Sequence, residues 1–221
     1  MDDLIAPQLI KKGAEASIFL ADWHERQVVL KKRLPKRYRH PDLDKQIRTY
    51  RTIHEPQLIN EAKKAGVQTP TIFLVDVRNA IIVMQFIVGK QVKTILNEAA
   101  KTEREEVCVK IGKSIGRLHK HGVIHGDLTT SNMILTPKRK IFFVDFGLGE
   151  KNPELEAMGV DMHLMRRALQ STHFRFSEEC FKAVFQGYSD EVGANVAKNV
   201  SEKMVEIRKR GRYVSERREE Q

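Results

Sequence analysis

The hydrophobic pattern of this chain changes near Gly89, and that change constrains the fold more than any other feature. Before Gly89, short β-branched apolar runs alternate with turn residues, which is typical of strands. After it, apolar residues recur every three or four positions, most clearly over residues 103–121, which predicts helices. Strands followed by helices favour an α+β fold with two lobes. We expect a β-rich lobe over residues 1–86 and a helical lobe over residues 87–221.

The first lobe contains one helical stretch, residues 43–65, which Pro56 interrupts. Proline costs about 3 kcal/mol in a helix interior but little in a first turn. Thr52 and Glu55 have the spacing of a capping box. We therefore expect a second helix to begin at Ile53, with a break before it.

Composition indicates an intracellular protein. The two cysteines are too few for a disulfide framework and lack the spacing of a zinc site. The N-terminus is acidic, unlike a signal peptide, and the longest apolar run, residues 80–84, is far shorter than the roughly 18 residues of a membrane helix. We expect a cytoplasmic protein without membrane contact, with a nuclear pool as well if the source is eukaryotic.

The positive charge is concentrated in two segments. The chain of 221 residues has 39 Lys and Arg against 29 Asp and Glu, a net charge of +10. Basic residues gather in residues 31–51 and again in residues 208–218. Both segments could bind a polyphosphate such as nucleic acid. The alternative is that they form solvated helix faces and a frayed tail.

Three polar residues in the second lobe have the spacing of a phosphoryl-transfer site. Asn132 follows Asp127 by five positions, and Asp145 begins an Asp-Phe-Gly triplet eighteen positions after Asp127. In such sites one carboxylate orients or deprotonates the acceptor hydroxyl, while an amide and a second carboxylate hold Mg²⁺ against the phosphates. Magnesium prefers few protein ligands, all of them hard oxygens. The pattern predicts an ATP-dependent enzyme that uses Mg²⁺.

The remaining parts of such a site precede these residues in the expected order. Lys31 ends an apolar strand and could hold the α and β phosphates, whereas strand alternation points Lys32 the opposite way. Glu55 could pair with Lys31, or it could only close the capping box. The segment Gly13–Ala16 has one glycine where a kinase usually has three, yet backbone N–H groups at a tight turn can still bind a phosphate.

Six segments resemble the small atypical kinase subunit of the KEOPS (EKC) complex, over nearly the whole chain. They are residues 12–16, 34–41 with the pattern P-K-x-Y-R-H-P, 51–52 before Glu55, 125–134 with H-G-D-L-T-T-S-N, 144–149 and 210–212. The resemblance implies a minimal protein-kinase fold with serine/threonine kinase or ATPase activity. It also implies a role in threonylcarbamoylation of adenosine in tRNA, with the transferase subunit and a small regulatory subunit as partners.

The resemblance also implies a role for individual site residues, and the roles are these: Asp127 as catalytic base; Lys31 on ATP with Glu55 as its partner; Asn132 and Asp145 on Mg²⁺; Gly13, Ala14, Glu15 and Ala16 over the phosphates; and Met84, Gln85, Phe86 and Ile87 along the adenine. Separately, the basic cluster near the end of the sequence predicts contacts with the tRNA backbone from Arg208, Lys209, Arg210 and Arg212. The segment along the adenine lacks both acidic residues of the family pattern. Because adenine is bound there by backbone groups, we expect ATP binding to survive.

Two absences bear on the mechanism. Gly126 stands where many protein kinases have an arginine that pairs with a phosphorylated activation loop. Only sixteen positions separate Asp145 from Asp161 (161 minus 145), the latter resembling the aspartate that braces a catalytic loop, and no A-P-E motif lies between them. We expect the isolated chain to hydrolyse ATP or phosphorylate itself, and to need a partner subunit to complete its site.

Two other functions remain open on the sequence alone. Aminoglycoside and choline kinases also use H-G-D-x-x-x-x-N, although they usually need a larger substrate lobe than the sixty residues after Asp161 (221 minus 161). A non-catalytic scaffold could bind tRNA through the basic tail and merely retain the nucleotide pocket. The intact Asp127, Asn132 and Asp145 argue against a scaffold.

Overall fold

A five-stranded antiparallel sheet forms the first part of the fold in the computed structural model, which describes the backbone of residues 4–219 and the side chains of residues 7–210. In spatial order its strands are β1 (Leu4–Lys12), β2 (Ser17–Trp23), β3 (Arg26–Lys32), β5 (Ile81–Gln85) and β4 (Ile72–Asp76). Each neighbouring pair is antiparallel. Between β2 and β3, His24 and Glu25 both have positive φ, as tight hairpin turns require.

The helix α1 (Pro41–Lys64) is continuous, so the prediction of a break before Ile53 is wrong. Pro56 lies inside the helix. The proline removes the N–H that would bond the carbonyl oxygen of Thr52. Thr52 and Glu55 are buried before Pro56, and Leu58 and Ile59 after it, so packing outweighs the local cost of the proline.

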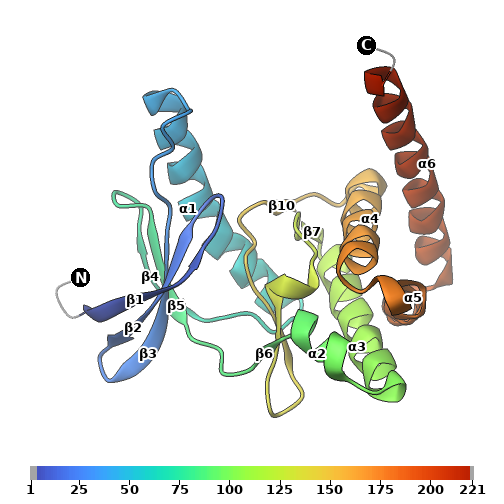
Figure 1. The fold of residues 1–221 in the computed structure, drawn as a ribbon, viewed down its shortest axis with the longest axis horizontal. Helices are drawn as coiled ribbons and strands as arrows, with labels where there is room; N and C mark the ends of the chain where they lie inside the picture. The colour runs from blue at the N-terminus through green and yellow to red at the C-terminus, as the bar shows by residue number, and fades with distance from the viewer. Residues whose placement is uncertain (1–3, 220–221) are drawn as a thin grey trace.

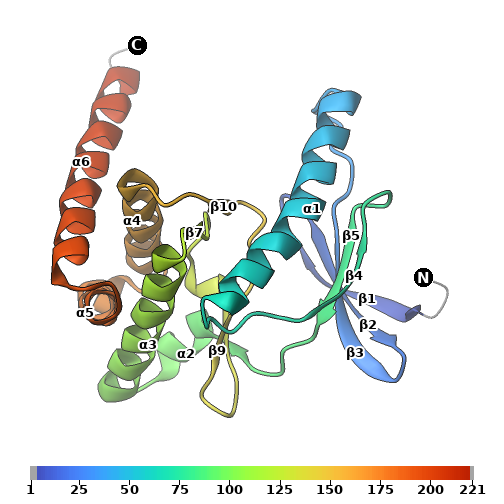
Figure 2. The same cartoon turned by 180° about the vertical axis from the view of Figure 1, so that it is seen from behind.

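The second part of the fold is mainly helical (Figures 1 and 2). Its elements are β6 (Lys90–Gln91), α2 (Val92–Glu98), α3 (Lys101–Lys120), β7 (Val123–Ile124), a 3₁₀ turn (Thr130–Asn132), β8 (Met133–Leu135), β9 (Ile141–Phe143), β10 (Glu150–Lys151), α4 (Leu155–Thr172), a 3₁₀ turn (Phe174–Phe176), α5 (Ser177–Val192) and α6 (Ala194–Glu219). Strands β6, β8 and β9 form a small sheet, and β10 pairs with β7. The small sheet carries the loop that precedes Met133.

Two glycines let α3 and α5 pack closely. A Cβ added at Gly112 would lie 1.8 Å from the carbonyl oxygen of Val184, and one added at Gly187 would lie 2.1 Å from that of Val109. Neither distance leaves room for a side chain, so the helices approach with backbone against backbone. This contact holds α3 and α5 in fixed relative positions.

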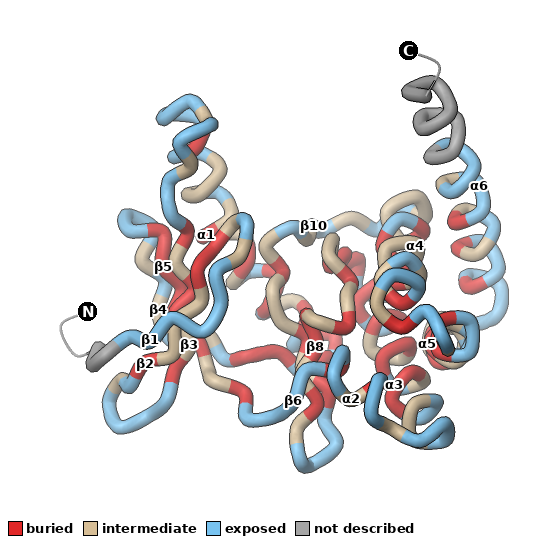
Figure 3. Tube along the Cα trace, in the orientation of Figure 1, coloured by how far each residue is buried: buried red, intermediate tan, exposed pale blue. Residues whose placement is uncertain are grey.

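The helix α1 belongs to both parts of the molecule. The first sheet has a small core of its own, which includes Val28 and Leu30. Leu58, Ile59 and Ala62 of α1 instead join the large core of the helical part. Figure 3 shows the buried residues of α1 toward the helical part and exposed residues at its other end.

The predicted α+β fold with a β-rich first lobe and a helical second lobe is confirmed. We retain residues 1–86 and 87–221 as the proposed lobes, since the first sheet ends at Gln85 and β6 begins at Lys90. Among the described residues, no helix has both the length and the apolar character of a membrane span.

Candidate active site

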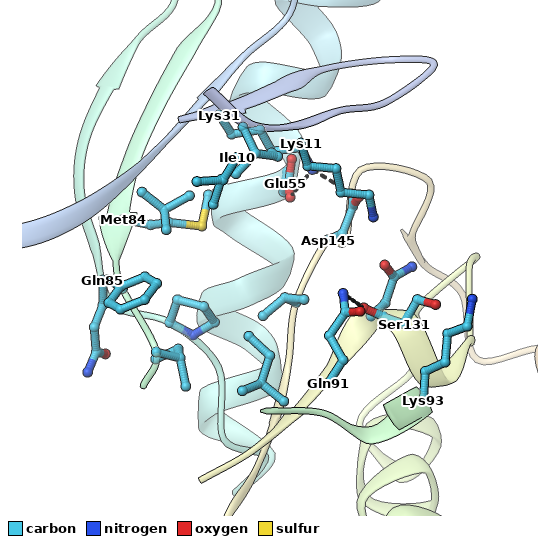
Figure 4. Close-up of a pocket in the computed structure, with 18 residues that line it drawn as sticks. Ile10, Lys11, Lys31, Glu55, Met84, Gln85, Gln91, Lys93, Ser131 and Asp145 are labelled. Carbon is cyan, nitrogen blue, oxygen red and sulfur yellow. Dashed lines mark hydrogen bonds and ion pairs between the residues drawn. The ribbon is translucent and has the colours of Figure 1, made fainter. Parts of the chain in front are cut away.

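A cleft of about 560 Å³ lies between the first sheet and the helical part. Figure 4 shows side chains from both parts converging on it, with Lys31, Glu55 and Asp145 close together at one end. Apolar side chains line much of the rest of it. The segment predicted to lie along the adenine is in its wall, as Met84, Gln85, Phe86 and Ile87.

Lys31 lies at the centre of the charged end of this cleft. Its Nζ is 2.7 Å from Glu55 Oε1 and 2.5 Å from Asp145 Oδ1. Strand β3 pairs with β2 and β5 on either side, which fixes the direction of the side chain. Lys31 is buried, whereas Lys32 lines neither this cleft nor the pocket beside it. Strand alternation thus places Lys31, and not Lys32, in the cleft, and its contact with ATP stays a proposal.

The carboxylate of Glu55 is shared between two cations. Its Oε1 accepts from Lys31 and its Oε2 from Arg33 Nη2. The structure thus brings Glu55 to Lys31, and no capping box forms because Thr52 and Glu55 are inside α1. Arg33 escaped the sequence analysis. The signal that could have found it is its position two residues after Lys31, on the same face of the chain.

Asp127 and Asn132 are held together in the loop before β8. Asn132 Nδ2 donates to Asp127 Oδ2 at 2.8 Å and to the backbone oxygen of Asp127 at 3.0 Å. Because the amide nitrogen is bonded inside the loop, the amide oxygen Oδ1 remains to bind a cation.

Asp161 holds the start of the same loop. Its Oδ2 accepts the backbone N–H of His125 at 2.8 Å, and its Oδ1 accepts that of Gly126 at 3.0 Å. Gly126 has a φ of 77°, and a Cβ there would lie 2.1 Å from the carbonyl oxygen of Leu148. An arginine at position 126 would be both strained and obstructed. The expected bracing function of Asp161 is confirmed.

A buried chain of side chains continues from Asp161 to α5. His119 Nε2 lies 3.3 Å from Asp161 Oδ2, and His119 Nδ1 lies 3.0 Å from the hydroxyl of Tyr188. All three side chains are almost completely inaccessible to solvent. Since Asp161 accepts from His119, Nδ1 accepts from Tyr188, whose pKa is raised by burial and by the charge of Asp161. His119 thus has a packing and hydrogen-bonding function.

Opposing effects act on Asp145. Burial raises the pKa of this carboxyl, but the charge and hydrogen bond of Lys31 prevail and hold the pKa below its usual value. Asp145 is therefore ionised at neutral pH.

The backbone of Asp145 has a φ of 65°, an uncommon conformation for a residue other than glycine. The residue that follows it, Phe146, packs against the ring of His125. Burial lowers the pKa of the His125 imidazole.

The donors available here suit magnesium. Asp145 and Asn132 present a carboxylate and an amide oxygen to the same cleft. Among the described residues, no group of three or more His, Cys, Asp or Glu side chains is placed to hold a metal ion. Magnesium does not need one, because it takes one or two protein oxygens and completes its shell with water and phosphate.

The predicted phosphate loop borders a second pocket of about 350 Å³. All four residues of Gly13–Ala16 line it, together with Asp127, and the Gly13 N–H donates to the Ala16 oxygen at 2.9 Å to close the turn. The pocket shares Lys31 and Asp145 with the larger cleft, so the two are continuous. Glu15 is partly exposed and contacts two arginines, Arg39 and Arg51.

The predicted tRNA-binding residues lie apart from the cleft. Helix α6 packs on α4 and α5, at the opposite end of the molecule from the first sheet (Figures 1 and 2). Arg208 and Lys209 are exposed, and Arg210 forms an ion pair with Glu156 of α4. The side chain of Arg212 lies outside the described residues.

Comparison with known proteins places the chain in a family. The model of the RIO domain matches residues 20–158. The KEOPS complex subunit Bud32 of Pyrococcus abyssi is 45% identical over 212 residues, covering 93% of this chain and 96% of that protein. The EKC/KEOPS complex subunit bud32 of Dictyostelium discoideum is 38% identical over 210 residues, covering 92% of this chain and 82% of that protein.

Longer relatives and a solved structure also match. A probable bifunctional tRNA threonylcarbamoyladenosine biosynthesis protein of Methanothermobacter thermautotrophicus is 41% identical over 95% of this chain, which spans only 37% of that protein. The erythromycin complex of Rv3197 from Mycobacterium tuberculosis has a TM-score of 0.55 at 15% identity, covering 80% of this chain and 55% of that one, and shows likeness of fold alone. The chain therefore belongs to the RIO-domain family, in the group of the Bud32 subunits of KEOPS complexes.

Proposed function

We propose that this chain is an atypical serine/threonine kinase and ATPase that acts as a KEOPS subunit in threonylcarbamoylation of tRNA adenosine. One observation carries the enzymatic part: Lys31 and Glu55 of the first part meet Asp145 of the second at one end of an apolar cleft. The names of the relatives support the KEOPS part and favour it over an aminoglycoside or choline kinase.

The cleft suits ATP in its shape and chemistry. Apolar side chains such as Val29 and Ile134 line the region next to residues 84–87, where the adenine would lie. The triphosphate would extend toward Lys31 and beneath the loop Gly13–Ala16. Backbone N–H groups at the turn and the ammonium of Lys31 provide the donors that phosphates require.

Three residues of this chain, Asp145, Asn132 and Asp127, then have separate functions in the reaction. Magnesium, when bound, neutralises charge that develops on the phosphates during transfer. Asp145 and Asn132 would hold it. Asn132 orients Asp127 by bonding its Oδ2, which directs the other carboxylate oxygen of Asp127 to the proton of the attacking hydroxyl or water.

The acceptor is water or a hydroxyl of this chain when the subunit is alone. The pocket beyond the phosphates measures about 350 Å³ and has walls from both parts of the fold. We propose that the transferase subunit and a small regulatory subunit of the complex, acting in the cytoplasm, complete the site for its physiological use.

Substitution of the two carboxylates tests the activity. Asp127→Asn should lower Mg²⁺-dependent ATP hydrolysis by at least about 10²-fold, the usual contribution of a general base, while ADP still binds. Asp145→Asn should remove both the activity and its dependence on Mg²⁺. Asp190→Asn, an exposed carboxylate on α5 outside both pockets, is the matched control. Unchanged hydrolysis in Asp127→Asn would contradict the proposal.

We further propose that the basic tail contacts the backbone of tRNA through Arg208, Lys209, Arg210 and Arg212. Each phosphate contact releases counterions, so the logarithm of the binding constant falls linearly with the logarithm of the salt concentration. The slope is proportional to the number of phosphate contacts. A chain truncated after Glu206 should bind tRNA more weakly and with a shallower salt dependence, measured by filter binding at several salt concentrations. Equal affinity and slope in the two chains would exclude the tail.

A further inference from the structure

The pocket beyond the nucleotide phosphates contains more cations than the ATP-binding residues account for. Lys11, Lys31, Arg33 and Arg51 all line it. Lys31 and Arg33 are paired with Glu55, as described above. Arg33 is only 2% exposed, yet its Nε has no hydrogen-bond partner within the described part of the chain. A buried donor without a partner in a polar pocket is uncommon, and it points to a ligand.

Arg51 also has a buried nitrogen without a hydrogen bond, among the described residues. It lies on α1 one turn before Glu55, and its Nη1 is 2.6 Å from Glu15 Oε2. That nitrogen is buried and, among the described residues, makes no hydrogen bond of acceptable geometry, so its hydrogens are not directed at Glu15. The contact is an ion pair without the two parallel hydrogen bonds that arginine forms with a well-matched oxyanion.

Glu15 does not depend on Arg51. Arg39 Nη2 donates to Glu15 Oε1 at 2.8 Å, and Arg39 Nη1 lies 3.5 Å from Oε2. The hydrogen bond from Arg39 is the main cause of the lowered pKa of Glu15, ahead of the charge of Arg51. Glu15 therefore keeps an ionic partner if Arg51 turns to another anion.

We propose that Arg51, supported by Arg33, binds the phosphate released from ATP, and that Glu15 substitutes for this phosphate in the free chain. The inference rests on the proposed ATPase function and adds a product subsite to it. Water attacks the terminal phosphorus, the bond to the bridging oxygen breaks, and ADP, inorganic phosphate and one proton result. The planar guanidinium of Arg51 suits two phosphate oxygens. It lines the same pocket as Asp127, next to the reaction.

Calorimetric titration of inorganic phosphate tests this subsite, in the free chain and in the complex with Mg²⁺ and ADP. Arg51→Gln should raise the dissociation constant for phosphate by about tenfold or more, since charge-assisted hydrogen bonds are lost. Arg48→Gln is the matched control, because Arg48 is on the same helix, pairs with Asp44 at 2.7 Å and lies outside the pocket. Glu15→Gln should tighten phosphate binding, because a competing carboxylate is removed.

The binding of ADP separates this inference from the proposed function. ADP should bind the wild type and Arg51→Gln equally. Unchanged phosphate affinity in Arg51→Gln would overturn the subsite, as would Glu15→Gln weakening phosphate as much as Arg51→Gln does. Absence of ADP binding in the wild type would contradict the proposed function instead, and titration of the free chain would still report on Arg51. If Arg51→Gln does not fold, Arg51→Lys replaces it in the titration. Phosphate affinity equal to that of the wild type in Arg51→Lys would contradict the proposal that the guanidinium binds two phosphate oxygens.

Discussion

The ammonium of Lys31 lies 2.5 Å from Asp145 Oδ1, on the same carboxylate that is proposed to hold magnesium. A magnesium ion on this carboxylate would be repelled by the ammonium beside it, so metal binding is favoured when Lys31 turns from Asp145 toward another anion. The phosphates of ATP would provide that anion. The structure thus predicts that nucleotide and metal bind together more readily than the metal does alone.

The first prediction concerns the titration of Asp145. Lys31 lowers the pKa of this carboxyl and burial raises it, so Lys31→Met should move the pKa upward, above its usual value. In the wild type, the lowered pKa in the folded chain adds to the free energy of unfolding at pH values above the pKa of this carboxyl in the unfolded chain. That contribution is lost as the pH falls through the pKa of the folded chain. Carbon NMR of the carboxyl group measures the shift. Lys32→Met should leave the titration unchanged, and an unshifted Asp145 in Lys31→Met would contradict the electrostatic account.

The second prediction concerns the chain of hydrogen bonds behind the catalytic loop. Tyr188→Phe leaves His119 Nδ1 without its donor, and Asp161→Asn can no longer accept from both His125 and Gly126. Because small displacements of catalytic groups are costly, Asp161→Asn should lower kcat for ATP hydrolysis by about tenfold or more, and Tyr188→Phe by less.

These residues act by positioning, so the KM for ATP should change little. Tyr50→Phe, an exposed tyrosine on α1, is the control. Steady-state kinetics well below the melting temperature distinguish positioning from stability alone. If either variant has a normal kcat and differs from the wild type only in a lower melting temperature, these hydrogen bonds have a purely structural function.

The third prediction uses the proline inside α1. Pro56→Ala restores a backbone N–H at a position where the helix is continuous, and should raise the free energy of unfolding by about 1 to 3 kcal/mol. Denaturation in urea measures this change. Gln57→Ala, at the exposed neighbouring position, should have a smaller effect. Lower stability of Pro56→Ala would mean that the packing requires the shape of the proline ring.

The fourth prediction compares two helical glycines. A methyl group at Gly112 meets the backbone oxygen of Val184 at 1.8 Å, whereas at Gly159 the nearest atom is the flexible Lys203 Cγ at 2.8 Å. Gly112→Ala should lower the free energy of unfolding by about 3 kcal/mol or more, because the backbones of α3 and α5 must separate. Gly159→Ala should change it by about 1 kcal/mol at most. Equal effects in the same urea experiment would contradict the close approach of the two helices.

The sequence was sufficient where chemistry and spacing coincide. Asp127, Asn132 and Asp145 could be found because phosphoryl transfer restricts both their types and their order. Lys31 could be chosen over Lys32 because the two-residue period of a strand decides which side chain points inward. Their positions as ligands of nucleotide and metal remain proposals.

Where tertiary packing decides the outcome, the sequence was insufficient. The break predicted before Ile53 does not exist, because burial on both sides of Pro56 stabilises a helix that local propensity disfavours. Helix α4 begins at Leu155 without a side-chain cap, so no capping residue in the sequence marks its start. Weak local signals of this kind are resolved only by the surrounding core.

The basic residues of the segment 31–51 are a further case. Arg39, Arg48 and Arg51 pair with Glu15 and Asp44 in the folded chain, and Arg33 is buried. Neither a uniform nucleic-acid patch nor a wholly solvated face describes them. No local pattern separates an arginine that enters a pocket from one that stays outside, because the carboxylates that select them come from other elements.

The shared helix α1 has a mechanical consequence. Leu58, Ile59 and Ala62 fix one end of it in the helical core, while the opposite end projects beyond the first sheet and exposes Tyr50 (Figures 1 and 2). Glu55 lies between the anchored and the projecting ends. A force applied to the exposed end would tilt the helix about its anchored end and move the Glu55 carboxylate relative to Lys31. Contact made at one exposed turn would thereby be transmitted to the ammonium that is proposed to bind the phosphates.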